Sequence, residues 1–234
     1  GSVYVFVRSL FGWSQQARLN ASDGATSDNF GSSVAINGNT AVIGSLGNIG
    51  GNAKQGSAYV FVRNGTTWTQ QQKLTASDGA ANDFFGWSVG IGTNTIVVGA
   101  EADDIGANGD QGSAYVFVFN GATWTQQQKL TASDGKLLSK FGWSVGISGE
   151  TVIVGAEGDT VGANSAQGSA YVFVRNGTVW TQQQKLTASD GAANDLFGIS
   201  VAISGDTVIV GAYGDDIGAN TSQGSAYVFV RGGM

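Results

Sequence analysis

The chain contains no cysteine, no histidine and no proline. Without cysteine it has no disulfide framework and no thiol nucleophile, and without histidine it lacks the commonest general base and zinc ligand. Without proline its turns depend on other residues, and the 38 glycines suit that role because glycine tolerates positive φ. These absences leave carboxylates as the main side chains with chemistry to offer.

Positive charge is scarce as well. The 11 Lys and Arg residues are outnumbered by 17 Asp and Glu, so the net charge is −6. Nucleic acids and anionic membranes are bound by clustered cations, and we therefore predict no nucleic-acid partner. No apolar run approaches the roughly 18 residues of a membrane-spanning helix, and the N-terminus enters a strand-like segment without a charged and apolar leader. We expect no membrane insertion and no signal peptide in this chain.

What the chain does have is an internal repeat of about 56 residues. The segment QGSAYVFV recurs with its glycine at Gly56, Gly112, Gly168 and Gly224, and an imperfect copy opens the chain at Gly1. We predict a single domain over residues 1–234. Its repeats span approximately 1–55, 56–111, 112–167 and 168–223, with a partial repeat at 224–234.

Each repeat has the pattern of four strands. Phe85–Ile91 alternates large with small residues, and Thr95–Val98 follows it after a short turn. Ala58–Val62 is apolar on both faces, as in a central strand, whereas the polar segment Trp68–Leu74 suits an exposed sheet edge. No segment shows sustained helical periodicity. The pattern predicts an all-β fold, a β-propeller of four-stranded antiparallel blades.

Three motifs carry a family resemblance. They are Phe-Gly at the inner strand (Phe85–Gly86), Val-Gly-Ala at the end of the second strand (Val98–Ala100) and Gly-Ser-Ala-Tyr-Val-Phe at the third (Gly56–Phe61). The chain resembles the FG-GAP repeat family, known from integrin α-chain propellers, and its Trp-Thr-Gln-Gln and Ala-Ser-Asp-Gly segments look like the bacterial branch. The resemblance implies an extracellular or cell-surface location in bacteria and a propeller used for interaction, not catalysis.

The predicted strands number 17, one more than four closed blades of four strands need. We expect the N- and C-terminal strands to pair. They would close four blades within one chain, or eight blades between two chains as a homodimer. Either Val3–Val7 or Ala226–Val230, both third-type strands, is then redundant. A segment of a longer array is the third reading.

Acidic residues recur in two loops of each repeat. One loop carries Ala-Ser-Asp-Gly after the outer strand, and a longer loop joins the second and third strands. In an antiparallel meander alternate connections emerge on the same side, so both loops should form one acidic rim, which is our candidate ligand surface. Its candidate ligand-binding residues are Asp78, Asp83, Glu101, Asp103, Asp104, Glu157, Asp159, Tyr213, Asp215 and Asp216.

The Asp-Gly pairs have a plainer interpretation. They suit a turn in which the aspartate bonds its own backbone, with the Lys or Arg found five residues earlier forming a surface ion pair in the same repeat. Calcium is the cation that such loops could take, because it favours several oxygen ligands. In integrin-type repeats, however, the calcium loop lies between the first and second strands, here the short turn Ile91–Thr95. We therefore predict no cofactor and no metal site.

Periodic residues are poor catalytic candidates because a catalytic site is normally single. We predict that the chain is not an enzyme but a non-catalytic scaffold that binds protein or adhesive ligands through the acidic rim loops. The alternative is a lectin-like propeller with one weak carbohydrate site per blade, strengthened by repetition. Aromatic rings for sugar stacking would come from the third inner-strand position, which reads Ser32, Trp87, Trp143 and Ile199 in successive repeats.

Overall fold

The computed structural model describes residues 1–232, which form seventeen β-strands and no helix. The predicted all-β class is confirmed, and no helix in this described part could cross a membrane. The strands are β1 (Val3–Ser9), β2 (Gly12–Leu19), β3 (Val34–Asn37), β4 (Thr40–Ser45), β5 (Ser57–Asn64), β6 (Thr67–Leu74), β7 (Phe85–Ile91), β8 (Thr95–Ala100), β9 (Ser113–Phe119), β10 (Trp124–Leu130), β11 (Phe141–Ser148), β12 (Thr151–Ala156), β13 (Ser169–Asn176), β14 (Val179–Leu186), β15 (Ser200–Ser204), β16 (Thr207–Ala212) and β17 (Ser225–Val230).

The strands form five antiparallel sheets in chain order. Three are complete four-stranded sheets, β3–β6, β7–β10 and β11–β14. The hairpin β1–β2 precedes them, and the three-stranded sheet β15–β17 follows them. Each complete sheet has four strands and ends in a polar outer strand, so the predicted four-strand repeat is confirmed. The two terminal sheets are incomplete versions of the same unit.

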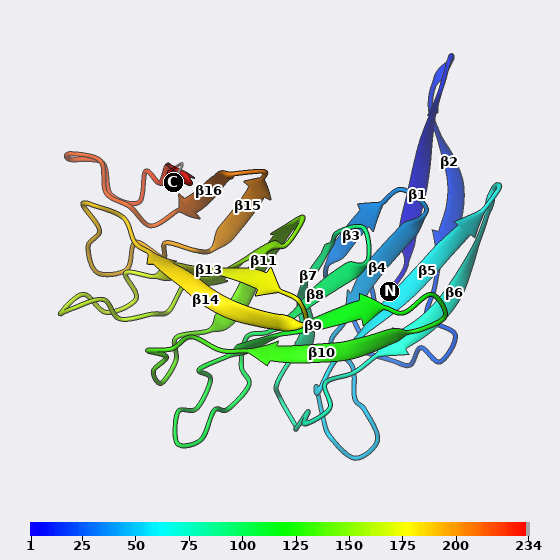
Figure 1. The fold of residues 1–234 in the computed structure, drawn as a ribbon, viewed down its shortest axis with the longest axis horizontal. Helices are drawn as coiled ribbons and strands as arrows, with labels where there is room; N and C mark the ends of the chain where they lie inside the picture. The colour runs from blue at the N-terminus through cyan, green and yellow to red at the C-terminus, as the bar shows by residue number, and fades with distance from the viewer. Residues whose placement is uncertain (233–234) are drawn as a thin grey trace.

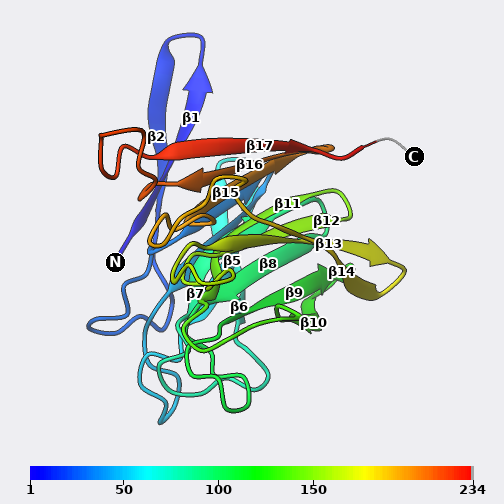
Figure 2. The ribbon, with the colours of Figure 1, turned by 90° about the vertical axis from the view of Figure 1, so that its left-hand side faces the viewer.

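Successive sheets pack face to face through their inner strands, with β7 against β4 and against β11, and β11 against β15. The sheets follow one another along an arc, with the hairpin β1–β2 at one end and the β15–β17 sheet at the other (Figure 1). Figure 2 views the array from the end that carries β17. Among the described residues the two terminal sheets do not share a ladder, so the ring is open in this structure.

Paired glycines allow the sheets to approach closely. A Cβ atom on Gly99 of β8 would lie 2.0 Å from the carbonyl oxygen of Gly142 in the next sheet, a distance that no real Cβ adopts. Gly142 itself has a φ of +96°, which also favours glycine. The Phe-Gly pair of one blade therefore fits against the Gly-Ala pair of the blade before it, and the repeated motif is a packing contact between blades.

The core is built between neighbouring sheets. Phe85 and Tyr115 are fully buried, with ring centroids 5.4 Å apart in an edge-to-face arrangement. They join a cluster that also contains Val42 and Val60 of the preceding sheet. Burial of each large apolar side chain contributes about 1.5–3 kcal/mol. Each blade is therefore stabilised mainly by its neighbours, as expected for a repeat array.

Candidate functional site: the acidic rim

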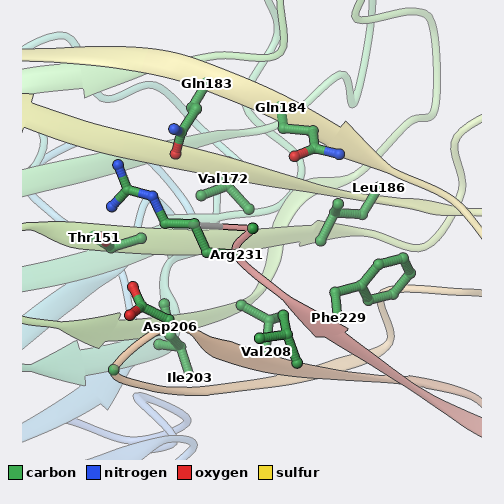
Figure 3. Close-up of a pocket in the computed structure, with 13 residues that line it drawn as sticks. Thr151, Val172, Gln183, Gln184, Leu186, Ile203, Asp206, Val208, Phe229 and Arg231 are labelled. Atoms are coloured by element: carbon green, nitrogen blue, oxygen red, sulfur yellow. The ribbon is translucent and has the colours of Figure 1, made fainter. Parts of the chain in front are cut away.

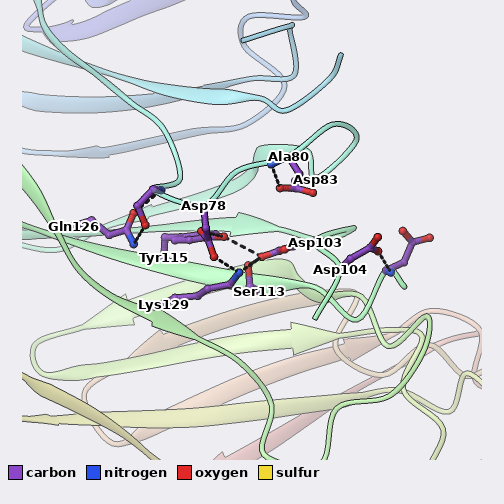
Figure 4. A network of polar contacts seen from close by, with 11 residues as sticks. Asp78, Ala80, Asp83, Asp103, Asp104, Ser113, Tyr115, Gln126 and Lys129 are labelled. Carbon is purple, nitrogen blue, oxygen red and sulfur yellow. Dashed lines mark hydrogen bonds and ion pairs between the residues drawn. The ribbon is translucent and has the colours of Figure 1, made fainter. Parts of the chain in front are cut away.

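A tyrosine joins the two acidic loops of the repeat. The hydroxyl of Tyr115, on β9, lies 2.9 Å from Asp78 Oδ1 and 2.9 Å from Asp103 Oδ2 (Figure 4). Asp78 belongs to the Ala-Ser-Asp-Gly loop, and Asp103 belongs to the loop between β8 and β9. The neutral phenol has one proton to donate, so a further donor is needed to hold both carboxylates.

Lys129 of β10 is this donor. Its Nζ lies 2.7 Å from Asp78 Oδ2 and 2.7 Å from Asp103 Oδ2. Ser113 also donates its hydroxyl to Asp103. The expected ion pair within a repeat was wrong, because Asp78 pairs with the lysine of the following repeat and not with Lys73. The cluster of Lys129, Tyr115, Asp78 and Asp103, which we call the clasp, therefore links successive blades.

The clasp has clear electrostatic consequences. Burial alone would raise the pKa of Asp78, but the hydrogen bonds from Lys129 and Tyr115 and the lysine charge outweigh it, so the pKa lies below its ordinary value. Burial likewise opposes the charge on Lys129, yet the two carboxylates raise the pKa of this lysine. Burial, reinforced by the charge of Asp103, raises the pKa of Tyr115. At neutral pH Asp78 is thus a carboxylate, Lys129 a cation and Tyr115 a neutral phenol.

The clasp recurs with instructive differences. The next repeat has a complete copy in Tyr171, Asp134, Asp159 and Lys185. The first repeat has only Tyr59, Asp23 and Lys73, because its shorter loop places no carboxylate at the Asp103 position. In the last repeat Tyr227 contacts Asp190 and Asp215, but no lysine or arginine of the described residues pairs with them.

The other predicted site residues divide into buried and exposed positions. Asp83 is buried and accepts the backbone N–H of Ala80, which closes its loop, and burial raises the pKa of this carboxyl. Asp104 and Asp216 are exposed, and each accepts a backbone N–H at the far side of its long loop. Tyr213 is exposed on the same loop as Asp216. The surface that a ligand can reach is therefore carried by Asp104, Asp216 and Tyr213, with the outer half of Asp78.

One cluster on this rim is not periodic. Glu101 and Glu157 are buried, and each has a carboxylate oxygen 4.0 Å from Lys140 Nζ. The lysine also lies 4.9 Å from the ring centroid of Trp143, which is 4.8 Å from that of Trp87. Burial, only partly offset by Lys140, raises the pKa of both glutamates. The first and last repeats have Leu46 and Tyr213 at the glutamate position, so this cluster occurs once.

The rim does not have the donor arrangement of a calcium site. Among residues 1–232, no three Asp or Glu side chains converge as metal ligands. The turns between first and second strands, such as Gly92–Asn94, are too short for a calcium loop of the integrin type. Three of the four carboxylate oxygens of the clasp, both of Asp78 and Oδ2 of Asp103, already contact lysine, tyrosine or serine. Calcium binding therefore has no support in the arrangement of these side chains.

Sequence reasoning missed the tyrosine at the centre of the clasp. Tyr59, Tyr115, Tyr171 and Tyr227 occupy one position in the third strand, which reads as an apolar segment. A tyrosine buried in a central strand needs a partner for its hydroxyl, and that requirement was the available signal. Lys140 was missed too, because only the packing of two adjacent blades brings it between Glu101 and Glu157.

These observations define a class of protein: a propeller-like repeat array of four-stranded antiparallel blades whose long loops gather on one rim. A family model described as FG-GAP repeat matches the chain four times, over residues 13–61, 68–117, 124–173 and 180–229. The chain therefore belongs to the FG-GAP repeat family. Each match runs from an outer strand to the next third strand. No curated protein is similar enough to count as a match.

Proposed function

We propose that the protein is a non-catalytic interaction scaffold which binds protein or adhesive ligands through its acidic rim. FG-GAP repeats are generally a non-catalytic scaffold and are typical of extracellular proteins. The observation that carries the proposal is the exposure of Asp104, Asp216 and Tyr213 on loops in which Asp104 and Asp216 each accept a backbone N–H from the far side of the loop. A preorganised loop loses little entropy when a ligand binds.

The charge of the rim favours a cationic partner. The chain has a net charge of −6, and acidic side chains are concentrated in the rim loops. The buried Asp103, Asp159 and Asp215 hold the loops in place, whereas the exposed carboxylates present charge to solvent. We infer an extracellular or cell-surface setting, and we infer that the array closes into a ring by pairing of its terminal strands.

An array of immobilised proteins with graded isoelectric points, printed beside glycans, tests the proposal. We expect basic protein spots to bind, and the double variant Asp104→Asn/Asp216→Asn to lose at least half of that signal. The matched control, Glu150→Gln/Asp206→Asn, removes two charges from the opposite rim and should bind like the unmodified chain. Equal binding by the rim variant and the unmodified chain would contradict the proposal.

The single cluster around Trp87 and Trp143 supports carbohydrate binding as a second candidate. The two half-buried tryptophans lie beside Lys140 and the buried Glu101 and Glu157, and aromatic rings next to charged hydrogen-bonding groups suit a sugar. This site would be one per chain and not one per blade. Glycan spots that bind the unmodified chain but not Trp143→Ala, with basic proteins silent, would favour it over the scaffold.

A further inference from the structure

The two ends of the array expose faces that interior blades bury. In the interior strand β9, Tyr115, Val116 and Phe117 are all buried. In β17, the equivalent Val228 is 62% exposed, whereas the side chains on its other face pack against the preceding sheet. In β1 the pattern is reversed: Val5 is buried and Phe6 is 54% exposed. Strands β1 and β17 both stand at the third position of the repeat. β17 packs on the sheet before it and lacks a sheet after it, whereas β1 packs on the sheet after it and lacks a sheet before it.

Interior blades are also joined by a tryptophan that hydrogen-bonds to the outer strand of the preceding blade. Trp180 of β14 donates its Nε1–H to Gln127 Oε1 of β10, at 2.8 Å. The side chain of Gln128 bonds both the backbone N–H and the carbonyl oxygen of Trp180, each at 2.8 Å. Trp124 makes the same contacts with Gln71 and Gln72 of β6. Arg175 covers the ring of Trp180 at 5.5 Å.

The outer strand β14 carries the same pair of glutamines, but no tryptophan of the described residues bonds them. In its place lies a pocket of about 330 Å³, between β14 and the β15–β17 sheet (Figure 3). Gln183, Gln184, Phe229 and Arg231 line it, and Arg231 stands at the position of Arg175. The pocket is roughly twice the volume of a cavity of about 150 Å³ that admits benzene, so an indole ring fits.

One tryptophan of this type has no preceding outer strand to pack against. Trp13 of β2 stands at the position of Trp180 and is 72% exposed. Its strand also carries Gln15 and Arg18, at the positions of Gln182 and Lys185.

The contacts of the interior equivalents show what these two residues would reach. Gln182 accepts the backbone N–H of Ser133, and Lys185 pairs with Asp134. One repeat further on, the corresponding groups are Ser189 and Asp190, which lie beside the open pocket end of the array. Strand β2 therefore carries the tryptophan, the glutamine and the cation with which a fourth strand beside β17 would contact the preceding blade.

We propose that strand β2 of a second copy adds to the free edge of β17 and seats Trp13 in this pocket. The exchange is reciprocal, so two copies close a ring of eight blades. Within one chain, β2 and the β15–β17 sheet lie at opposite ends of the arc, which is why the occupant comes from a second copy (Figure 1). A free strand edge is a template for such pairing, and the contacts repeat those already present between interior blades.

In the open array, β1 occupies the place that β17 of the second copy would take in the closed ring. A Cβ atom on Gly1 would lie 1.9 Å from the carbonyl oxygen of Phe30, much as Gly56 approaches Phe85 at 2.0 Å. Gly224 makes no such approach in the open array. When β17 of the second copy pairs with β2, Gly224 takes the place of Gly1, and Val228 replaces Val5 on the first complete sheet. The redundant third-type strand is therefore β1.

Gly211 provides an independent marker of the same interface. A Cβ atom on interior Gly155 would lie 2.0 Å from the carbonyl oxygen of Gly198 in the next sheet. On Gly211, the equivalent atom would lie 2.4 Å from Ser200 Oγ, a side-chain atom that can rotate away about χ1, and it meets no backbone atom of a next sheet. In the closed ring the neighbour of Gly211 is Gly31 of the second copy. A methyl group at Gly211 thus requires only a rotation of the Ser200 side chain in the open array, whereas in the ring it would meet a backbone carbonyl.

Light scattering after size exclusion tests the proposal on the full chain. We expect a mass twice the 23.9 kDa of one chain, and Trp13→Ala and Gly211→Ala should each return it to 23.9 kDa while near-ultraviolet circular dichroism remains that of a folded protein. The matched control is Phe11→Ala, which removes an aromatic ring from the fully exposed tip of the same hairpin and should leave the mass doubled.

Four results would overturn the proposal. The first is a mass of 23.9 kDa for the unmodified chain at every concentration, as closure within one chain would give, and the second is a mass that grows beyond two copies. The third is a doubled mass for Trp13→Ala, and the fourth is that Phe11→Ala loses the doubled mass as Trp13→Ala does. If the variants fail to fold, acrylamide quenching of the unmodified chain decides. Dilution to the monomer should increase quenching as Trp13 becomes exposed, and unchanged quenching would overturn the proposal.

Discussion

Replacement of Lys129 by methionine should destabilise the protein far more than the same change at Lys73. Methionine keeps an apolar stem over the ring of Tyr115 but removes the charge, so the comparison isolates electrostatics. Lys129 neutralises two carboxylates, whereas Lys73 neutralises one. The two lysines occupy the same position in successive repeats, which makes each the natural control for the other.

The expected magnitude follows from burial. Asp103 has a side chain only 7% exposed, and removing the partner of a buried charge costs about 3–5 kcal/mol. Tyr115 and Ser113 still donate to this carboxylate, which reduces the expected cost to about 2–3 kcal/mol. The Asp23 side chain that pairs with Lys73 is 50% exposed, and an exposed pair contributes at most about 1 kcal/mol. The two variants should therefore differ by roughly 2 kcal/mol.

Urea unfolding followed by tryptophan fluorescence measures both free energies of unfolding. The pKa of Asp78 is lowered in the folded protein, so the stability it contributes is present at neutral pH and is lost as the pH falls below about 4. The deficit of the Lys129→Met variant should shrink over the same range, since the protonated carboxyl of Asp78 no longer needs the lysine. Equal losses in the two variants at pH 7, or a deficit that persists in acid, would refute the reasoning.

Three further predictions concern other parts of the molecule. In dilute solution Gly155→Ala should cost about 3 kcal/mol or more in the urea experiment, because its methyl group meets a backbone carbonyl, whereas Gly211→Ala should cost less than about 1 kcal/mol. Burial raises the pKa of Glu101, so the charged form of this side chain opposes folding. Glu101→Gln should therefore raise the free energy of unfolding by roughly 1 kcal/mol at pH 7, and this gain should disappear below about pH 4, where the carboxyl is protonated in the folded and unfolded chain alike. Calcium should produce no heat in isothermal titration and no change in melting temperature, and a saturable heat would contradict our interpretation of the rim.

Much of the fold could be predicted because repetition averages out local ambiguity. The strand Phe85–Ile91 has the predicted bounds in the structure, and the predicted outer strand Trp68–Leu74 begins only one residue late. The meeting of the two acidic loops on one rim was also predictable, since it follows from the direction of alternate strands. These features depend on residues that are close in the chain or separated by one repeat length.

The internal geometry of the rim could not be predicted in the same way. Lys129 reaches back 51 residues to Asp78, although Asp134 lies five residues away in the sequence. The choice depends on the face of the strand to which Lys129 belongs and on the stagger between blades. The sequence also gives Asp103 and Asp104 the same standing as neighbouring acids in one loop. Only their burial in the structure separates Asp103, which holds the loop, from Asp104, which faces solvent.

The sequence by itself determined the repeating unit, its four strands, and the excess of acid on its loops, because these are set by periodicity, turn chemistry and composition. Only the tertiary structure decided which partner each repeated group selects and whether every partner is present. Trp13 and Trp180 occupy equivalent positions, yet Trp180 is buried against the preceding blade and Trp13 is exposed. The physical reason is that a blade buries its faces only against neighbouring blades, so the same residue makes different contacts at an end of the array and in its interior.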